Sequence, residues 1–174
     1  IKKKLPKISL VSKINWNKLD LVFLSLPNGE AQKLIKKIFF VNKNLKFIDL
    51  SADFRISKVS TYEKNYKLKH KAKNLINHCL YSIPELINKK INNYRIISNP
   101  GCYPTSIQIP LIPIINKNLI KIKGISIDSK SGYSGAGKNL KSKFTHKNLY
   151  SSIFAYSPKI HRHICEIDEQ LLKL

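Results

Sequence analysis

Residues 20–50 read DLVFLSLPNGEAQKLIKKIFFVNKNLKFIDL, and this stretch decides the fold of the chain. Apolar residues run almost without a break through residues 20–27, which is typical of a buried strand in a parallel sheet. Residues 30–40 then predict an amphipathic helix, and residues 45–50 predict a second strand. The apolar face of that helix consists of Ala31, Leu34, Ile35 and Ile38. Strand, helix and strand at this spacing predict a βαβ unit, and therefore an α/β fold with a parallel sheet.

The predicted strands end in turn-forming or polar residues. Pro27, Asn28 and Gly29 follow the first strand, and the loop of residues 51–55 (SADFR) follows the second. We expect residues 56–93 to form a polar, helical excursion before a third strand over residues 95–98. In parallel sheets ligands gather beyond the carboxyl ends of the strands, so these loops are predicted to form a ligand-binding rim.

Residues 98–105 (SNPGCYPT) place Cys102 on a tight turn between the third strand and an apolar helix predicted over residues 106–115. Backbone N–H groups and the positive end of a helix dipole favour a thiolate at such a position. Gly101 allows close approach of a substrate, and Pro104 suits the first helical turn. Cys102 is therefore the candidate nucleophile. The alternative is a buried structural cysteine, which is the commoner fate of a lone cysteine.

A second cluster, His161-Arg162-His163, is followed closely by Cys165 and Glu166. A cysteine nucleophile needs a partner that takes up and returns protons, and His161 or His163 has the right chemistry, with Glu166 as an orienting carboxylate. The alternative is a plain surface turn. No metal site is predicted, because two histidines at i and i+2 point apart on a strand and no third ligand has a standard spacing.

Residues 122–128 alternate like a half-buried strand and open into a Gly/Ser-rich loop. Gly132 begins a Gly-x4-Gly-Lys match to a phosphate-binding loop, but Asn139 stands where such loops carry the Ser or Thr that holds Mg²⁺. We therefore do not predict nucleotide hydrolysis, although N–H groups of such a loop can still contact a phosphate. Residues 166–174 predict the start of a helix.

Composition limits the function classes. The formal charge of +22 invites a nucleic-acid interpretation, but 29 of the 32 basic residues are lysines, scattered along the chain, and only Arg55, Arg95 and Arg162 are arginines. Nucleic acid is therefore not the predicted partner. No apolar run reaches the roughly 18–20 residues that span a bilayer, so no membrane contact is predicted. Three widely spaced cysteines favour a reducing compartment, the cytoplasm.

Six blocks, taken in order, resemble the N-acetyl-γ-glutamyl-phosphate reductase family of arginine biosynthesis. The blocks are residues 22–29 (VFLSLPNG), 48–55 (IDLSADFR), 81–86 (YSIPEL), 98–105 (SNPGCYPT), 128–137 (DSKSGYSGAG), and 155–156 with 161–167 (AY and HRHICEI). The resemblance implies an incomplete Rossmann-type parallel sheet, followed by the start of a second α/β domain of the glyceraldehyde-3-phosphate-dehydrogenase-like type. It implies a partial NADP-binding domain over residues 1–101 and a partial catalytic and dimerisation domain over residues 102–174.

The resemblance also implies the reaction and the roles of the site residues. Cys102 would form a thioester with an acyl phosphate substrate, NADPH would reduce it to the semialdehyde, and His161 corresponds to the acid/base histidine. The other implied site residues fall into two groups. Substrate-binding residues are Arg55, Asn99, Tyr156, Arg162, His163 and Glu166; cofactor-binding residues are Pro27, Asn28, Gly29, Ser131, Gly132, Ser134 and Gly135. The full-length enzyme would be a homo-oligomer, a dimer or a tetramer.

Two alternatives remain open from the sequence. One is the sister reductase that acts on a carrier-linked aminoadipyl phosphate in lysine synthesis, and the other is a lysine-rich nucleic-acid-binding module. The family's opening strand and Gly-rich dinucleotide turn are expected before residue 1, and the family continues beyond residue 174. We therefore expect this chain to be the middle of an enzyme and to be inactive by itself.

Overall fold

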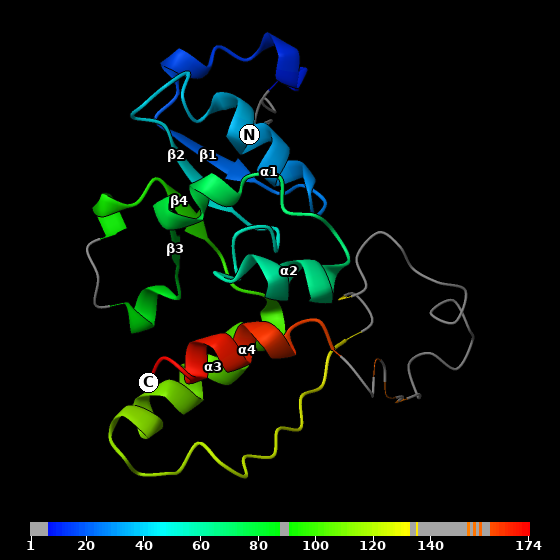
Figure 1. The fold of residues 1–174 in the computed structure, drawn as a ribbon, viewed down its shortest axis with the longest axis vertical. Coiled ribbons are helices and arrows are strands. Elements are labelled where there is room, and N and C mark those ends of the chain that lie inside the picture. The colour runs from blue at the N-terminus through cyan, green and yellow to red at the C-terminus, as the bar shows by residue number, and fades with distance from the viewer. Residues whose placement is uncertain are drawn as a thin grey trace, which may run out of the picture. The chain divides into compact units, whose positions relative to one another are not determined.

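The computed structural model describes residues 7–87, 91–132, 135, 153, 155, 157 and 161–174. The chain divides into two compact units, Ile1–Gly101 and Cys102–Leu174. We call the first the sheet unit and the second the helix unit, and describe each by itself (Figure 1).

The sheet unit contains a four-stranded sheet in the order β1-β2-β4-β3 (Figure 1). The strands are β1 (Leu21–Leu24), β2 (Lys46–Asp49), β3 (Cys79–Tyr81) and β4 (Ile96–Ser98). All three pairings, β1 with β2, β2 with β4 and β3 with β4, are parallel. The predicted parallel sheet and α/β class are therefore confirmed.

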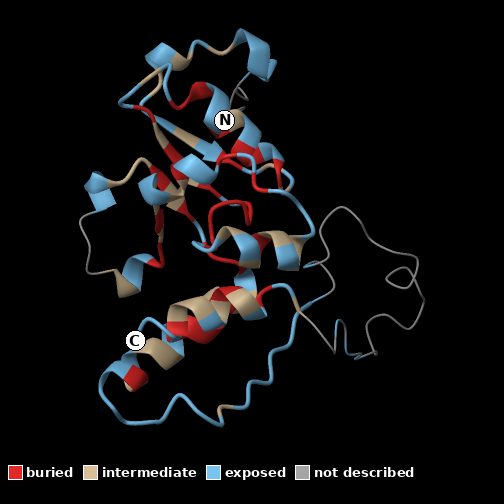
Figure 2. Ribbon diagram, in the orientation of Figure 1, coloured by how far each residue is buried: buried red, intermediate tan, exposed pale blue. Residues whose placement is uncertain are grey.

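Helix α1 (Glu30–Ile38) connects β1 to β2 and completes the predicted βαβ unit. Its buried residues are Ala31, Gln32, Ile35 and Ile38, whereas Leu34 is half-buried. This face belongs to one core cluster with apolar residues of the strands, among them Leu24, Phe47 and Ile96. Figure 2 colours the buried residues of the chain red. Full burial of each large apolar side chain contributes roughly 1.5–3 kcal/mol. The sheet and α1 thus share one hydrophobic core.

Two predictions about this unit were wrong. The strand over residues 20–27 is not fully buried, because β1 lies at the edge of the sheet and alternates its side chains between two faces. Leu24 faces the core, but Phe23 is 64% exposed. The stretch 56–93 is also not wholly helical: α2 (Val59–Tyr66) is followed by β3. Three residues are too few for a strand pattern, and β3 is specified by its pairing with β4.

Short 3₁₀ helices complete the described connections. They are η1 (Val11–Lys13), η2 (Trp16–Lys18), η3 (Lys73–His78), η4 (Pro84–Leu86) and η5 (Ile91–Asn93). Within the described residues, no helix has the length and apolar character needed to cross a bilayer.

The helix unit contains α3 (Cys102–Asn116) and α4 (Ile164–Leu171), which pack side by side (Figure 1). Both predicted helices are confirmed. The strand predicted over residues 122–128 is wrong, since these residues form no strand and all but Ile125 are exposed. The described part of this unit holds no second strand with which they could pair, and Gly124 has φ of +80°.

Candidate active site

Cys102 is the first residue of α3, and it is exposed. The first N–H groups of any α-helix have no acceptor within the helix, so they point toward whatever lies at its N-terminus. The alternative of a buried structural cysteine is therefore wrong for Cys102. Its position agrees with the turn predicted from the sequence, four residues beyond the last residue of β4.

A cluster of rings lies beside this end of α3. The ring of Tyr103 meets the ring of His161 edge to face, with centroids 5.4 Å apart, and lies 6.2 Å from the ring of His163. The two imidazoles are 4.8 Å apart. His163 is buried, and Glu166, in the first turn of α4, is fully buried. Residues 162 and 163 do form a turn, but His163 is buried, so the triplet is not a plain surface turn. The candidate acid/base His161 contacts the residue next to Cys102.

The hydrogen bonding of His161 determines which ring nitrogen carries the proton in its neutral form. The backbone N–H of His163 donates to Nδ1 of His161 over 3.2 Å, so the neutral ring carries its proton on Nε2. Partial burial, and secondly the charge of Arg162, lower the pKa of His161. At neutral pH this imidazole is therefore neutral and carries its proton on Nε2.

The other two cysteines differ from Cys102. The thiol of Cys165 donates to the carbonyl of Arg162 over 3.2 Å, and the thiol of Cys79 donates to the carbonyl of Phe54 over 3.4 Å. Both residues are only partly accessible, and burial raises the pKa of each thiol. They are therefore poorer nucleophiles than a cysteine that solvent reaches freely.

The loop after β2 is buried rather than open. Residues 51–55, which the sequence predicted as part of a ligand-binding rim, are all buried. Both carboxylate oxygens of Asp53 accept the N–H of Gly29, over 2.7 and 2.9 Å, and one of them also accepts the N–H of Gln32 over 3.0 Å. Asp53 therefore caps the N-terminus of α1 from another loop.

A second carboxyl group is buried in the same loop region. The N–H and hydroxyl of Ser51 donate to Asp49 over 2.9 and 3.0 Å. Burial nevertheless raises the pKa of Asp49 to about 6. Asp49 is therefore part of the buried packing at the carboxyl end of β2.

Arg55 and Asn99, both predicted to bind substrate, are brought together in the sheet unit. The Nε–H of Arg55 donates to the carbonyl of Asn99 over 2.8 Å, and one of its terminal nitrogens donates to the carbonyl of Leu50 over 2.9 Å. Arg55 is buried, whereas Asn99 is exposed. Arg55 thus ties the loop after β2 to the loop after β4.

The predicted cofactor residues fall in separate places. Pro27 is exposed, Asn28 is half-buried, and the Oδ1 atom of Asn28 accepts the N–H of Ala52 over 3.2 Å. Ser131, Gly132 and Gly135 are exposed in the helix unit, and the N–H of Gly135 donates to the carbonyl of Gly132 over 3.0 Å. Ser134 and Tyr156, and most of the Gly-x4-Gly-Lys match, lie outside the described residues. Arg162 is exposed beside the histidine cluster.

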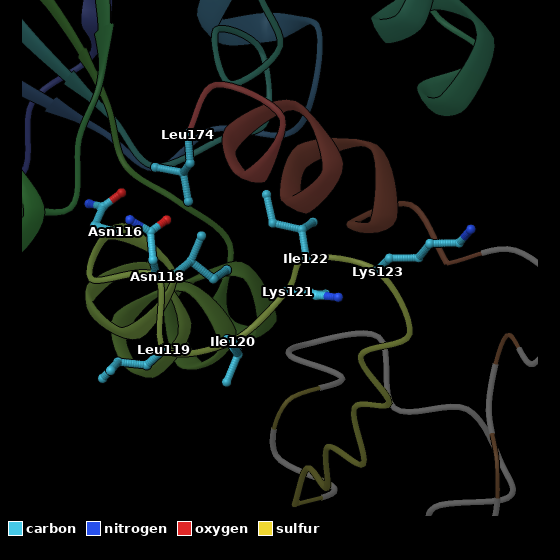
Figure 3. Close-up of a pocket in the computed structure, with 9 residues that line it drawn as sticks. Asn116, Asn118, Leu119, Ile120, Lys121, Ile122, Lys123 and Leu174 are labelled. Atoms are coloured by element: carbon cyan, nitrogen blue, oxygen red, sulfur yellow. The ribbon is translucent and has the colours of Figure 1, made fainter.

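A cavity of about 890 Å³ lies at the other end of α3 (Figure 3). Its lining residues are Ile115, Asn116, Asn118, Leu119, Ile120, Lys121, Ile122, Lys123 and Leu174. An α-helix rises 1.5 Å per residue, so the two ends of α3 are about 20 Å apart. The cavity is therefore separate from Cys102, and its lining holds no cysteine, histidine or carboxylate side chain. Among the described residues, no group of three or more His, Cys, Asp or Glu is placed to hold a metal ion.

The sequence did not predict several residues around Cys102 and around the loop after β2. Tyr103 directly follows the candidate nucleophile Cys102 in the sequence, so this position could have indicated that it belongs to the site. Asp53 stands in a polar loop between apolar neighbours, but its partners Tyr62 and His70 come from the polar stretch 56–93, where no local motif singles them out. Only the fold brings those side chains to Asp53.

Comparison with known proteins defines the class. Residues 2–94 match the family described as semialdehyde dehydrogenase, NAD binding domain, and residues 102–174 match the semialdehyde dehydrogenase dimerisation domain. The chain belongs to the semialdehyde dehydrogenase family. These matches agree with the predicted incomplete Rossmann-type sheet followed by the start of a second α/β domain.

The relatives are more specific. The chain is 41% identical over 167 residues to a probable chloroplastic N-acetyl-gamma-glutamyl-phosphate reductase of Oryza sativa subsp. japonica, covering 96% of this chain and 40% of the relative. It is 40% identical over 168 residues to the Arabidopsis thaliana protein of the same name, covering 97% and 41%. It is 40% identical over 153 residues to the N-acetyl-gamma-glutamyl-phosphate reductase of Alkaliphilus metalliredigens, covering 88% and 44%. The predicted resemblance is confirmed, and the chain spans about two fifths of the length of these curated relatives.

Proposed function

We propose that the full-length protein is an NADP-dependent reductase that converts N-acetyl-γ-glutamyl phosphate to the corresponding semialdehyde. The names of the relatives support the substrate, and the semialdehyde dehydrogenase match supports the reaction type. The observation that carries the proposal is the exposed Cys102 at the start of α3, next to a tyrosine that contacts His161. In this proposal residues 1–101 are part of the NADP-binding domain, and residues 102–174 are part of the catalytic and dimerisation domain.

The first step forms a covalent bond to Cys102. The Cys102 thiolate attacks the carbonyl carbon of the acyl phosphate, and a thioester forms as the carbon–oxygen bond to phosphate breaks. Phosphate leaves with the electron pair of that bond and takes up a proton from solvent. Splitting one difficult displacement into two easier steps is the general advantage of such a nucleophile.

NADPH supplies, when bound, the hydride that reduces the thioester carbonyl. The neutral His161 is suited to donate a hydrogen bond from its Nε2–H to the carbonyl oxygen, which would carry negative charge once the carbon is reduced. As this oxyanion re-forms the carbon–oxygen double bond, the carbon–sulfur bond would break, which gives the aldehyde and returns Cys102 as a thiolate.

The substrate is an anion, and the proposed site supplies cationic and polar partners for it. Arg162 is exposed beside the histidines and is suited to pair with a carboxylate or phosphate. Two N–H groups of Arg55 are already bonded to backbone carbonyls, so we assign Arg55 chiefly to holding Asn99 in place. The other proposed substrate contacts are Tyr156, His163 and Glu166.

The sheet unit fits NADP at the carboxyl end of β1, where Pro27 is exposed and Asn28 is partly accessible. The N-terminus of α1 does not fit a phosphate, because Asp53 already occupies the N–H groups of Gly29 and Gln32. We therefore assign Pro27, Asn28 and Gly29 to contacts other than phosphate binding. Ser131, Gly132, Ser134 and Gly135 are the proposed contacts from the helix unit.

The dimerisation-domain match supports a homo-oligomer, and we propose a dimer or tetramer of the full-length enzyme. The three cysteines are free thiols, which supports a reducing compartment such as the cytoplasm. Sedimentation of the full-length protein tests the first of these proposals.

A substrate panel tests the proposed function. The full-length protein is assayed for phosphate-dependent NADP⁺ reduction with N-acetylglutamate semialdehyde and, separately, with a carrier-linked aminoadipate semialdehyde. We expect activity with the first compound and little with the second. Preference for the carrier-linked compound would instead assign the protein to lysine synthesis, and inactivity with both would contradict the proposal.

A further inference from the structure

The Asp53 side chain holds together a network that the reaction itself does not use. Asp53 is fully buried, and besides the N–H groups of Gly29 and Gln32 its carboxylate accepts the hydroxyl of Tyr62 over 2.8 Å. Its own N–H donates to the hydroxyl oxygen of Ser51 over 3.1 Å. A buried carboxylate is costly unless it is hydrogen-bonded in this way, so its burial calls for a physical reason.

Gly29 supplies that reason. It is the N-cap residue of α1 and has φ of +88°, a left-handed conformation that favours glycine. Glycine has no side chain with which to cap the helix, so the capping carboxylate comes from a loop 24 residues further along the chain. The negative charge also lies at the positive end of the α1 dipole.

The same contacts fasten two loops to one another. The loop after β1 (residues 27–29) is bonded to the loop after β2 through Asp53 and through the second contact from Ala52 to Asn28. These loops follow the neighbouring parallel strands β1 and β2, so both lie at the carboxyl ends of the strands. Asp53 therefore sets the position of the turn that carries Pro27 and Asn28.

We propose that Asp53 is a positioning residue for the NADP-binding turn: it holds residues 27–29 in the conformation that receives the cofactor. The inference rests on the proposed function. Asp53 itself is enclosed by protein, so it acts through the turn and not by touching NADP.

His70 supports this arrangement through the backbone of Asp53. The Ala72 N–H donates to Nδ1 of His70 over 3.2 Å, so the Nε2–H of the neutral ring donates to the carbonyl of Asp53 over 2.8 Å. The His70 ring also lies edge to face with Phe54 and Tyr62, with centroids 5.5 and 5.2 Å away. Both the backbone and the side chain of Asp53 are therefore held.

The test is Asp53→Asn in the full-length protein. The amide group of asparagine points a donor toward the N–H groups of α1, so at least one capping bond is lost. We expect faster amide hydrogen exchange at Gly29 and Gln32, and roughly tenfold weaker equilibrium binding of NADP⁺ in the absence of substrate. The KM for NADP⁺ rises similarly, whereas kcat changes much less.

Asp20→Asn is the matched control, because Asp20 is an exposed carboxylate one residue before β1. It should leave both NADP⁺ binding and exchange unchanged. Tyr62→Phe removes one partner of Asp53 but keeps the ring, and it decides the question if Asp53→Asn does not fold. We expect Tyr62→Phe to weaken NADP⁺ binding about threefold.

The inference is overturned if a folded variant shows faster exchange at Gly29 but binds NADP⁺ as tightly as the wild type, since Asp53 is then a helix cap only. The proposed function fails separately, if the wild type binds NADP⁺ but reduces it with neither semialdehyde. Binding measured without substrate keeps the two results apart.

Discussion

At the scale of single residues, the surroundings of a side chain differ between two clusters. One contains Cys102, Tyr103 and His161, and the other contains Asp53, Tyr62 and His70. Cys102 and His161 are accessible or partly accessible, whereas His70 is buried in the sheet unit between backbone partners. The sequence predicts Cys102 and the His161–His163 cluster because local motifs carry them. It does not predict Asp53, Tyr62 and His70 as a group, because their contacts join residues from separate loops.

His70 gives a prediction about stability and pH. Burial lowers its pKa in the folded chain, so the unfolded chain binds more protons as the pH falls through about 6.5. His70 therefore favours folding fully above pH 6.5, and this stabilisation is lost as the pH falls further. Protonation also removes the acceptor for the Ala72 N–H. The charged groups near His70 are Asp53, Lys73 and Glu63.

The free energy of unfolding of the wild type and of His70→Gln, measured by urea titration from pH 8 to pH 5, checks this prediction. The difference between the two should shrink as the pH falls. Taking the difference removes the opposite contribution of Asp49, whose raised pKa favours folding as the pH drops below about 6. A difference that stays constant or grows toward pH 5 would contradict the assignment.

At the scale of elements, local patterns predict the elements that carry a signal of their own. The first strand and α3 follow from apolar runs, α1 from its amphipathic period, and α4 from the helix start over residues 166–174. Helix α3 continues through Pro110 and Pro113, both exposed, so packing of the whole helix outweighs two residues that disfavour it. β3 is missed and residues 122–128 are wrongly predicted as a strand, because a strand exists only where a partner strand lies beside it.

Arg95, one residue before β4, is hydrogen-bonded to the connection between α1 and β2. It donates to the carbonyls of Phe39 and Asn42, after α1, and to Leu45 before β2, over 2.6–3.2 Å. Its guanidinium lies 3.8 Å from the centre of the Phe39 ring. Arg95→Lys keeps the charge but loses the planar fork, so we expect a loss of about 2 kcal/mol in the free energy of unfolding.

Arg162→Lys is the control, since Arg162 is exposed, and it should change the free energy of unfolding by less than about 0.5 kcal/mol. Urea denaturation followed by circular dichroism measures both. Equal stabilities of Arg95→Lys and Arg162→Lys would show that the three carbonyl contacts do not hold the α1–β2 connection.

At the scale of the whole molecule, the formal charge of +22 is spread over the chain. Like charges repel one another most strongly in the compact state, and salt screens that repulsion. We therefore expect the melting temperature to rise as the ionic strength increases from about 0.01 to about 0.15 M. Calorimetry checks this, with sucrose at matched osmolality as a control for non-ionic effects.

The nucleic-acid alternative makes a different prediction. It requires tight duplex binding with a steep linear fall of log K against log salt concentration. Weak binding that disappears at about 0.15 M salt is what scattered lysines alone would give. A melting temperature that falls with salt, together with tight and sequence-selective binding, would contradict the view that the charge has no partner.

The central claim is that Cys102 forms the thioester, and trapping that intermediate tests it most directly. Full-length protein is mixed with N-acetyl-γ-glutamyl phosphate without NADPH, quenched in acid, digested and analysed by mass spectrometry. We predict an N-acetylglutamyl adduct on the Cys102 peptide, formed with release of phosphate. The adduct should be absent in Cys102→Ser and retained in Cys165→Ser, the matched control. No adduct on the wild type, or full reductase activity in Cys102→Ser, would contradict the account.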